Sequence, residues 1–377
     1  MQLPGSTPVT APEPGSRPDC DVSLIDCDVH HWLRNLDDLL PYLSTAAQRQ
    51  VRQQGFLFPG SGYFNAPRQA VRTYLADGFN LENYTGHEQG WDLGRLQKEH
   101  LDRWHIDYAV LNSGVVYTAS VIPDCDYAAA MCTAFNDWSL EQWIAQEPRL
   151  KLAMSISTSD PKLAAAEIDR IGEHPDVVAV VVPTGARRPY GNRIYDPIWE
   201  ACERRALVAF VHPGCEGVGM AGSPTGVGYP TYYLETRLAR SQMAMAHFTS
   251  LIVEGSFEKF PGLRVALLEV DQYWVAGLCW KLDADWKSLR DQTPWVKELP
   301  SEYFRKHIRI GSQPMMEPEP PSHLQRLLEA MKADDTLIYC SDWPHFDWND
   351  PVTALPGISQ PLKQRILSEN ARELLGF

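Results

Sequence analysis

Short apolar runs alternate with longer amphipathic stretches along the chain from about residue 22 onward. The short runs are rich in β-branched residues, as strands are, whereas the stretches between them are rich in Ala and Leu, as helices are. Strands are predicted at residues 22–30, 107–113, 151–157, 177–184, 207–214, 264–271, 308–314 and 336–342. Helices are predicted at residues 128–146, 161–173, 196–206, 235–260 and 321–333. This order indicates repeated βα units and a parallel sheet.

The number and the composition of the strands favour one architecture. Several strands are apolar throughout, which is typical of parallel strands that are covered on both faces. Eight such strands with helical crossovers predict an α/β fold, a closed (β/α)8 TIM barrel, rather than a doubly wound open sheet. A barrel with insertions reaches roughly 400 residues. One barrel over residues 22–377 therefore accounts for most of the chain.

Two segments interrupt the βα rhythm. Residues 1–21 are rich in proline and have no apolar core, so we expect a flexible N-terminal tail and no signal peptide. Residues 31–106 separate the first two strands and contain a stretch rich in glycine, proline and aromatic residues. We expect these residues to form an inserted lid over the mouth of the barrel.

Polar side chains stand at the ends of several predicted strands. In a (β/α)8 barrel the C-terminal ends of the strands carry the chemistry. The residues at these ends are Asp26, Asp28 and His30 on the first strand, His212 on the fifth, Glu269 and Asp271 on the sixth, and Asp342 on the eighth. Because side chains alternate with period two along a strand, Asp26, Asp28 and His30 are predicted to face one side. Asp26 is therefore the competing carboxylate of the site.

Four of these residues predict a metal site. Asp28, His30, His212 and Asp342 form a set of nitrogen and oxygen ligands that suits Zn²⁺, Mn²⁺ or Fe²⁺. We expect them to bind one divalent ion at the mouth of the barrel. Glu269 is expected either to transfer a proton or to be a buried structural acid, because a buried carboxyl group needs a partner.

At these residues the sequence resembles the amidohydrolase superfamily, in the amidohydrolase-related (amidohydrolase 2) branch. This branch contains aminocarboxymuconate-semialdehyde and γ-resorcylate decarboxylases beside hydrolases. The similar pieces are, in order, IDCDVH, LDRWHIDYAVL, FNDW, VHPG, EGSFEKFPGLRVALLE, YCSDWPHFD and ENARELLG, between about residues 22 and 377. The resemblance implies a metal ion on the four ligands named above and a proton carried by Asp342.

Two positions depart from the superfamily pattern. Many members carry His-x-His on the first strand, where this chain has Asp28-x-His30. That arrangement resembles the carboxylate-x-His variant of the decarboxylases and points to Mn²⁺ rather than Zn²⁺. Relatives often place a histidine where this chain has Glu269. The histidine acid or base is then absent, and Glu269 either replaces it or only supports the site.

Two reactions fit this set of ligands. The first is hydrolysis of an amide, lactone or related bond by a metal-activated water, whose proton Asp342 takes and returns to the leaving group. The alternative is non-oxidative decarboxylation of an aromatic or enoic acid, in which protonated Asp342 donates to carbon as CO₂ departs. Release of CO₂ without oxygen or another cofactor separates the two. A barrel that binds a partner without catalysis is a third hypothesis, which predicts a protein that takes up no metal.

Four further residues are predicted to contact a small-molecule substrate. Arg187 and Arg188 would hold a substrate carboxylate by paired hydrogen bonds. His345 and Trp343 follow the eighth strand, and Trp343 could stack on an aromatic ring. The GxGxxG match at residues 217–222 is followed by Ser-Pro rather than by a helix, so a dinucleotide site is not expected.

The composition of the chain limits the classes of partner that we expect it to bind. The chain has 34 Lys plus Arg against 48 Asp plus Glu, a formal net charge of −14, which argues against a nucleic-acid partner. No apolar stretch approaches the roughly 18 residues that span a bilayer, so no membrane partner is expected. The start of the sequence and the sparse cysteines predict a cytoplasmic protein with reduced thiols. Assembly into a homo-oligomer is compatible with these features.

Overall fold

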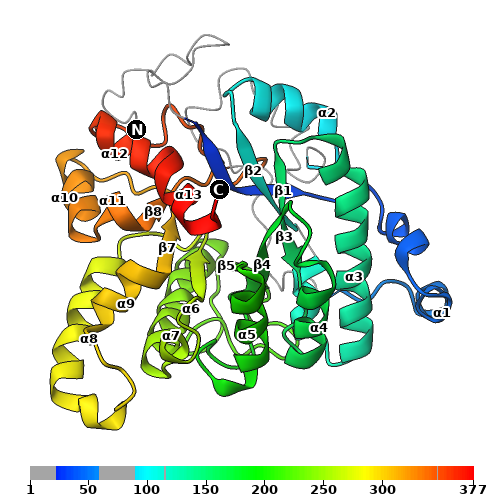
Figure 1. The fold of residues 1–377 in the computed structure, drawn as a ribbon, viewed down its shortest axis with the longest axis horizontal. Coiled ribbons are helices and arrows are strands. Elements are labelled where there is room, and N and C mark those ends of the chain that lie inside the picture. Colours follow the sequence, from blue (N-terminus) through cyan, green and yellow to red (C-terminus); the bar gives the residue numbers. More distant parts are fainter. Residues whose placement is uncertain (1–22, 59–89, 114–115, 346) are drawn as a thin grey trace.

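The computed structural model describes residues 23–58, 90–113, 116–345 and 347–377 (Figure 1). The predicted tail at 1–21 and residues 59–89 of the predicted lid lie outside the described residues. Eight parallel strands form one sheet in which each strand pairs with the next along the sequence. They are β1 (Ile25–His31), β2 (Tyr108–Ser113), β3 (Leu150–Ser155), β4 (Val177–Pro183), β5 (Val208–His212), β6 (Arg264–Leu267), β7 (Ile308–Gly311) and β8 (Leu337–Ile338). All eight predicted strands are present.

The sheet closes on itself between β1 and the segment that follows β8. The backbone N–H of His30 donates to the carbonyl of Trp343 at 2.8 Å, and that of Cys27 donates to the carbonyl of Tyr339 at 3.0 Å. Val29 and Trp343 form an isolated parallel bridge. The prediction of a (β/α)8 TIM barrel is therefore confirmed.

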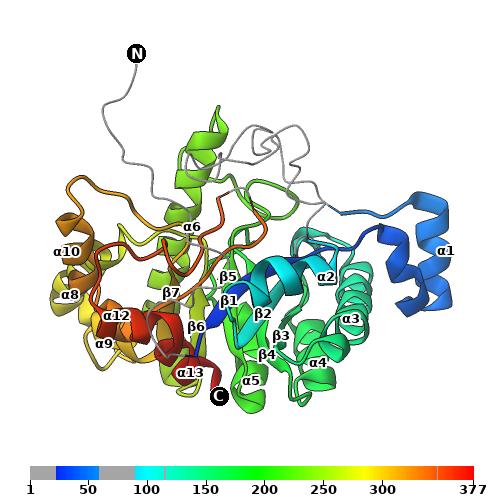
Figure 2. The same cartoon turned by 90° about the horizontal axis from the view of Figure 1, so that it is seen from above.

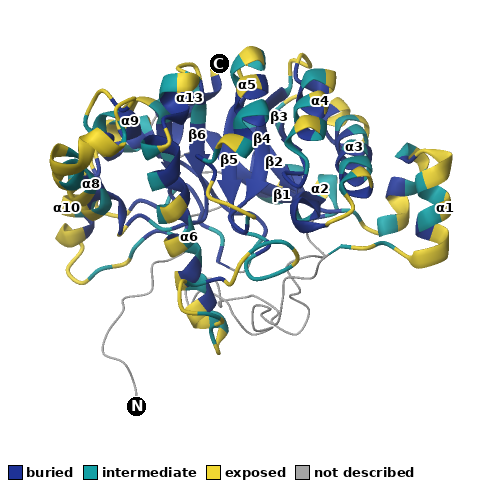
Figure 3. Ribbon diagram, turned by 90° about the horizontal axis from the view of Figure 1, so that it is seen from below, coloured by how far each residue is buried: buried dark blue, intermediate teal, exposed yellow. Residues whose placement is uncertain are grey.

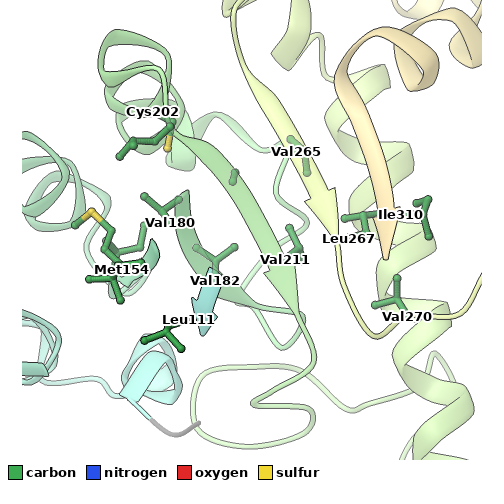
Figure 4. Close-up of a cluster of buried hydrophobic side chains, with 14 of the residues drawn as sticks. Leu111, Met154, Val180, Val182, Cys202, Val211, Val265, Leu267, Val270 and Ile310 are labelled. Carbon is green, nitrogen blue, oxygen red and sulfur yellow. The ribbon is translucent and has the colours of Figure 1, made fainter. Parts of the chain in front are cut away.

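The apolar strands are buried on both faces. All seven residues of β4 are buried. Ala179 and Val181 pack in the barrel interior. Val180 and Val182 pack in the layer between the sheet and the helices, together with Val211 (Figure 4). Each fully buried valine contributes about 1.5–3 kcal/mol, which is why such a run is stable as a parallel strand and not as a surface strand.

The helices cover the outside of the barrel, with buried inner faces and exposed outer faces (Figure 3). They are α3 (Cys125–Gln142), α4 (Pro161–Ile171), α5 (Asp196–Arg205), α6 (Tyr233–Val253), α7 (Ser256–Lys259), α8 (Val275–Leu289), α9 (Pro300–His307), α10 (Ser322–Ala330), α11 (Ala333–Thr336), α12 (Gln360–Gln364) and α13 (Asn370–Leu375). At the start of α4 the Asp160 side chain accepts hydrogen bonds from the N–H groups of Lys162 and Leu163, and Pro161 takes the first turn.

The helix predicted over residues 235–260 is two helices. α6 ends at Val253 and α7 begins at Ser256, because Gly255 between them has a left-handed φ of +75°. A Cβ at this glycine would lie 2.4 Å from Cδ1 of Trp295, so no larger residue fits. The first turns of α6 project beyond the other helices (Figure 2).

The described part of the inserted segment lies on the side of the barrel. It consists of η1 (Leu36–Tyr42), α1 (Thr45–Gln54), α2 (Leu93–Arg95) and η5 (Leu96–Asp102). Gln142 of α3 donates to the hydroxyl of Tyr42 at 3.2 Å, and the hydroxyl of Tyr127 accepts from the N–H of Leu57 at 2.9 Å. Residues 36–57 therefore pack along α3. Among the helices of the described part, none has the length and apolarity needed to cross a bilayer.

Candidate metal centre

The first two residues of the site come from β1, where a β-bulge changes which side chains face inward. The pairing of β1 with β2 shifts register between Asp26 and Val29. A bulge places an extra residue in one strand. As a result Cys27 packs in the barrel interior, while Asp28 and His30, also on β1, belong to one buried group at the mouth.

Asp26 lies outside this group, so the prediction that it shares a side with Asp28 is wrong. Its carboxylate accepts hydrogen bonds from Nε2 of His100 at 2.8 Å and from the N–H groups of Ser341 at 2.9 Å and Asp28 at 3.1 Å. His100 belongs to η5, outside the sheet. Asp26 therefore ties β1 to η5 and to the segment after β8. Period-two alternation fails here because the bulge interrupts the regular strand.

His212 comes from the end of β5 with a defined ring orientation. Its Nδ1 lies 2.9 Å from the carbonyl of Pro213, an acceptor, so Nδ1 carries the proton. The hydroxyl of Tyr117 lies 3.3 Å from the same nitrogen. When the ring is neutral, Nε2 carries the lone pair, and it lies 3.5 Å from Oδ2 of Asp28. This is the tautomer that a metal ligand needs.

Asp342 follows β8 and turns its carboxylate toward β1. Its backbone is left-handed, with a φ of +62°, a conformation that costs about 1–2 kcal/mol for a residue with a Cβ. Its N–H donates to the carbonyl of Asp28 at 3.0 Å, and its Oδ1 lies 3.0 Å from Nε2 of His30. The same oxygen accepts a hydrogen bond from Nδ1 of His345. The left-handed backbone thus places the carboxylate where it meets the side chains of His30 and His345.

These four side chains fit a divalent metal ion. Asp28, His30, His212 and Asp342 each offer one ligand atom, and the four atoms lie within 4.8 Å of one another. Oδ2 of both aspartates, both ring nitrogens of His30 and Nε2 of His212 are buried and make no hydrogen bond within the described residues. Buried polar atoms without partners are rare. Their concentration at one point, in a carboxylate and imidazole set, indicates a site for one divalent ion such as Zn²⁺ or Mn²⁺.

The electrostatics of the group also favour a cation. Burial lowers the pKa of His30, and His345 nearby lowers it further, so this imidazole is neutral, as a ligand must be. Burial opposes protonation of His212 as well, but Asp28 and the other carboxylates outweigh it and raise the pKa of His212 to about 9. A group that attracts a proton so strongly carries excess negative charge, which a divalent ion would neutralise.

Glu269 lies at the edge of the group, just after β6, with a left-handed φ of +53°. Its Oε2 is 3.6 Å from Nε2 of His212. Its Oε1 accepts a hydrogen bond from Nη1 of Arg240 on α6. The arginine neutralises this buried carboxylate, which accounts for its presence there. It thus lies beside His212, and its catalytic role stays a prediction.

A small cavity adjoins Glu269. It measures about 120 Å³ and is lined by Leu234, Arg237, Leu238, Arg240, Glu269, Asp271 and Pro314. Both arginines point into it from α6, and Arg237 also forms an ion pair with Asp347, with Nη2 2.7 Å from Oδ2. Glu269, which lies beside His212, therefore also borders a pocket that presents two guanidinium groups.

The predicted substrate contacts are only partly at the site. His345 is there, with its ring 4.4 Å from that of His30. Trp343 is buried and stacks on His100, with ring centroids 5.6 Å apart, so its ring packs against η5. Arg187 and Arg188 are exposed, and no described contact joins their guanidinium groups to the metal-binding group. The structure therefore does not bring these two arginines to the site.

The loop after β4 explains why the two arginines face solvent. Tyr190, at the end of that loop, is buried and its hydroxyl donates to the carbonyl of Pro183 at 2.7 Å. Nδ1 of His247 on α6 lies 3.2 Å from the N–H of Tyr190. These contacts tie the end of the loop to the barrel, and Arg187 and Arg188, which precede Tyr190, are exposed.

Sequence reasoning missed Trp32, Arg237 and Arg240. The ring of Trp32 stacks on His30 with centroids 5.6 Å apart and also lines a larger cavity of about 390 Å³ with Trp91. The sequence contained a signal for each of these three residues. Trp32 is two residues beyond His30, and the two arginines are three residues apart near the start of the helix that follows the fifth strand, which puts them on one helix face.

Comparison with known proteins identifies the family. The family model described as amidohydrolase matches residues 25–377. A γ-resorcylate decarboxylase of Polaromonas sp. strain JS666 is 22% identical over 276 residues, 67% of this chain and 78% of the relative. A γ-resorcylate decarboxylase of Rhodococcus jostii strain RHA1 is 22% identical over 269 residues, with the same shares covered.

Solved structures share the fold. An amidohydrolase from Mycobacterium avium subsp. paratuberculosis K-10 has a TM-score of 0.70 and 21% identity, covering 95% of this chain and 100% of that one. A dihydroxybenzoic acid decarboxylase from Polaromonas sp. JS666, with bound manganese and 2-nitroresorcinol, has a TM-score of 0.63 and 18% identity, covering 94% and 97%. Because the family match extends over the whole barrel and its mouth, this chain belongs to the amidohydrolase family and is an enzyme of that family.

Proposed function

We propose that this enzyme removes CO₂ from an aromatic carboxylic acid with a hydroxyl group next to the carboxylate, and that it uses one divalent ion, Mn²⁺ by preference. The observation that carries the proposal is the buried group of two aspartates and two histidines in a chain whose named relatives are γ-resorcylate decarboxylases. Manganese in a solved decarboxylase of the same fold supports the choice of metal.

Asp28, His30, His212 and Asp342 would hold the ion. When bound, the ion would engage the carboxylate and hydroxyl oxygens of the substrate and draw electron density from them. The protein fixes the ligands beforehand, since Asn112 donates to Asp28 from the neighbouring strand. This hydrogen bond keeps the Asp28 carboxylate directed at the point where the ligand atoms meet.

Asp342 is proposed to supply the proton. The ring carbon that bears the carboxylate takes a proton from the Asp342 carboxyl group, the bond to the carboxylate breaks, and its electron pair restores the aromatic ring as CO₂ leaves. His345 supports this role because its Nδ1 donates to the same carboxylate while its side chain is 31% exposed. Solvent can therefore return a proton to Asp342 through His345 after each turnover.

Trp32 is proposed to hold the aromatic ring. Its indole lies against both His30 and His345, with centroids 5.6 Å and 5.4 Å away. An aromatic wall beside the metal-binding group packs well on a flat substrate and limits the access of water to the reacting carbon. This arrangement suits a phenolic acid better than a flexible aliphatic amide.

Hydrolysis uses the same ligands but has less support. The curated relatives and the manganese-containing structure named above are decarboxylases, so they favour the alternative over the amide or lactone hydrolase that the sequence first suggested. Glu269, in place of the histidine of relatives, remains the proposed second acid or base for either reaction.

The test is a substrate panel on protein loaded with Mn²⁺. Hydroxybenzoic acids with an ortho hydroxyl group, including 2,6-dihydroxybenzoate, are incubated without oxygen, and CO₂ and the phenol product are quantified together. Lactones and amides of similar size are assayed in parallel. We expect equimolar CO₂ and phenol. Hydrolysis of lactone or amide without release of CO₂ from any acid would overturn the proposal.

A matched pair of variants tests the proton donor. Asp342→Asn should lower kcat by at least about 100-fold, because removal of a general acid typically costs that much. Asp102→Asn makes the same chemical change at a carboxylate that is 61% exposed and far along the chain from the site. It should leave kcat unchanged. Equal loss in both variants would point to damage to the fold rather than to catalysis.

A further inference from the structure

Arg237 and Arg240 lie three residues apart on α6, so they share one face of the helix. Both line the cavity of about 120 Å³ beside Glu269. The side chains are 23% and 18% exposed, which is low for arginine. Such burial is costly unless the guanidinium groups have anionic partners. Arg237 forms an ion pair with Asp347, and Arg240 forms one with Glu269.

Arg240 retains an unused donor. Its Nη1 donates to Glu269, but its Nε is buried and makes no hydrogen bond within the described residues. A guanidinium group offers five N–H donors in a planar fork that matches a carboxylate. Among the described residues this donor has no acceptor, so it is open to one that a bound molecule brings.

One side chain, Glu269, lies between the cavity and the metal-binding group. Glu269 contacts Arg240 with one carboxylate oxygen and lies 3.6 Å from Nε2 of His212 with the other. A molecule that is held at the metal ligands thus reaches the arginines across the width of a single carboxyl group. A ring with two substituents can span this distance.

The other carboxylates at the cavity are already engaged. Oδ2 of Asp271 accepts a hydrogen bond from Ser241, and burial raises the pKa of Asp271, which favours its neutral form. Glu269 and Asp347 are each neutralised by an arginine. An incoming anion therefore meets compensated charges and a free donor rather than an uncompensated acidic patch.

We infer that Arg237 and Arg240 form a subsite for a second carboxylate of the substrate, separate from the carboxylate that is lost. This inference rests on the proposed decarboxylation, because the second group is defined relative to the first. The substrate class is then a hydroxylated aromatic dicarboxylic acid. Arg237 and Arg240 line the same pocket and would bind this carboxylate together.

Binding is the first readout, since it does not depend on turnover. Isophthalate and benzoate lack the hydroxyl group and serve as unreactive probes for the Mn²⁺-loaded enzyme, with Kd measured by calorimetry. We expect isophthalate to bind at least 10-fold more tightly than benzoate. In Arg237→Gln this ratio should fall to near one, and Arg237→Lys, which keeps the charge beside Asp347, should retain part of it.

Turnover is the second readout. The ratio of kcat/KM for 2-hydroxybenzoates with and without a second carboxylate should exceed 10 for one ring position in the wild type and should fall at least 10-fold in Arg237→Gln. Arg326→Gln, at an exposed position of α10, is the matched control and should leave the ratio unchanged. Melting curves of all variants identify any that fails to fold.

The outcomes separate the two proposals. Decarboxylation of monocarboxylic acids with no preference for diacids, in binding or in turnover, overturns the subsite and leaves the proposed function in place. Preferential binding of isophthalate through Arg237, without CO₂ from any acid, supports the subsite and overturns the proposed function. Equal weakening of benzoate and isophthalate in both Arg237 variants would show that this arginine holds the fold rather than a second carboxylate.

Discussion

Addition of Mn²⁺ to metal-free protein is expected to raise its melting temperature by about 3 °C, and His212→Ala should abolish most of this rise. The physical reason is that the ion binds the folded state, where four ligand atoms lie within 4.8 Å, and not the unfolded chain, where they are far apart. In the metal-free folded state two buried aspartates and Glu269 repel one another around His212. The ion relieves this repulsion.

The magnitude follows from the site and the length of the chain. A ligand at 100 times its Kd stabilises the folded state by about 2.7 kcal/mol. The entropy of unfolding is about 2.1 cal/mol/K per residue near 60 °C, and for a chain of 377 residues this is about 0.8 kcal/mol/K. Dividing the stabilisation of about 2.7 kcal/mol by this entropy gives a rise in melting temperature of about 3 °C. Ten times more metal would add about 1.4 kcal/mol, or about 2 °C.

The assay measures the melting temperature by circular dichroism at increasing concentrations of metal. Protein stripped with a chelator is titrated with Mn²⁺ and, separately, with Zn²⁺, and bound metal is counted by elemental analysis. His323→Ala, at an exposed position of α10, is the matched control and should shift as the wild type does. No shift in the wild type, or an equal shift in His212→Ala, would refute the assignment of these four residues as the metal site.

Three further variants test other parts of the structure. Hydrogen bonds from Arg149 lower the pKa of Glu147 from 4.5 to about 2, so the ionised form stabilises the folded state, and Glu147→Gln should cost about 2 kcal/mol at pH 7. This difference is fully present above pH 4.5 and should shrink as the pH falls toward 2, as measured by urea unfolding. Asp26→Asn should lose about 1–3 kcal/mol of stability but keep its metal content, because Asp26 binds His100 and not the metal group. Arg187→Gln should change kcat/KM by less than about twofold in the decarboxylation assay, since surface substitutions rarely perturb a site.

Each of these three has a contrary result. If the difference in the free energy of unfolding between the wild type and Glu147→Gln stayed constant from pH 7 to 3, the stabilising contact with Arg149 would not depend on the charge of Glu147. Loss of bound metal in Asp26→Asn would restore Asp26 as a ligand and remove the argument from the β-bulge. A 10-fold rise of KM in Arg187→Gln would show that the loop after β4 reaches the substrate.

The barrel could be predicted from the sequence because its strands carry a strong local signal. A parallel strand that is covered on both faces must be apolar at nearly every residue, as β4 is, and such runs are rare elsewhere in the chain. Helix starts are also local, since Pro161 and the Asp160 cap act within one turn. The break at Gly255 was missed because what forbids a side chain there is Trp295, forty residues away in sequence.

The four-residue group could be predicted for a related reason. In a barrel of parallel strands all the C-terminal ends meet at one mouth, so polar residues that end apolar runs converge there whatever the loops do. Asp28, His30, His212 and Asp342 satisfy that rule, and the structure brings them together. No detail of a loop is needed to place them on the same side of the molecule.

The sequence by itself thus determined the barrel and which strand ends meet at its mouth, and the tertiary structure decided which neighbours complete the site. The bulge in β1 turned Asp26 away from Asp28, a change of one residue in register that no periodicity signals. Arg240 on α6 donates a hydrogen bond to Glu269, whereas Arg187 is exposed to solvent. Strand ends converge because the sheet itself is closed, whereas the direction of a side chain on a loop or a helix depends on contacts with residues distant in the chain.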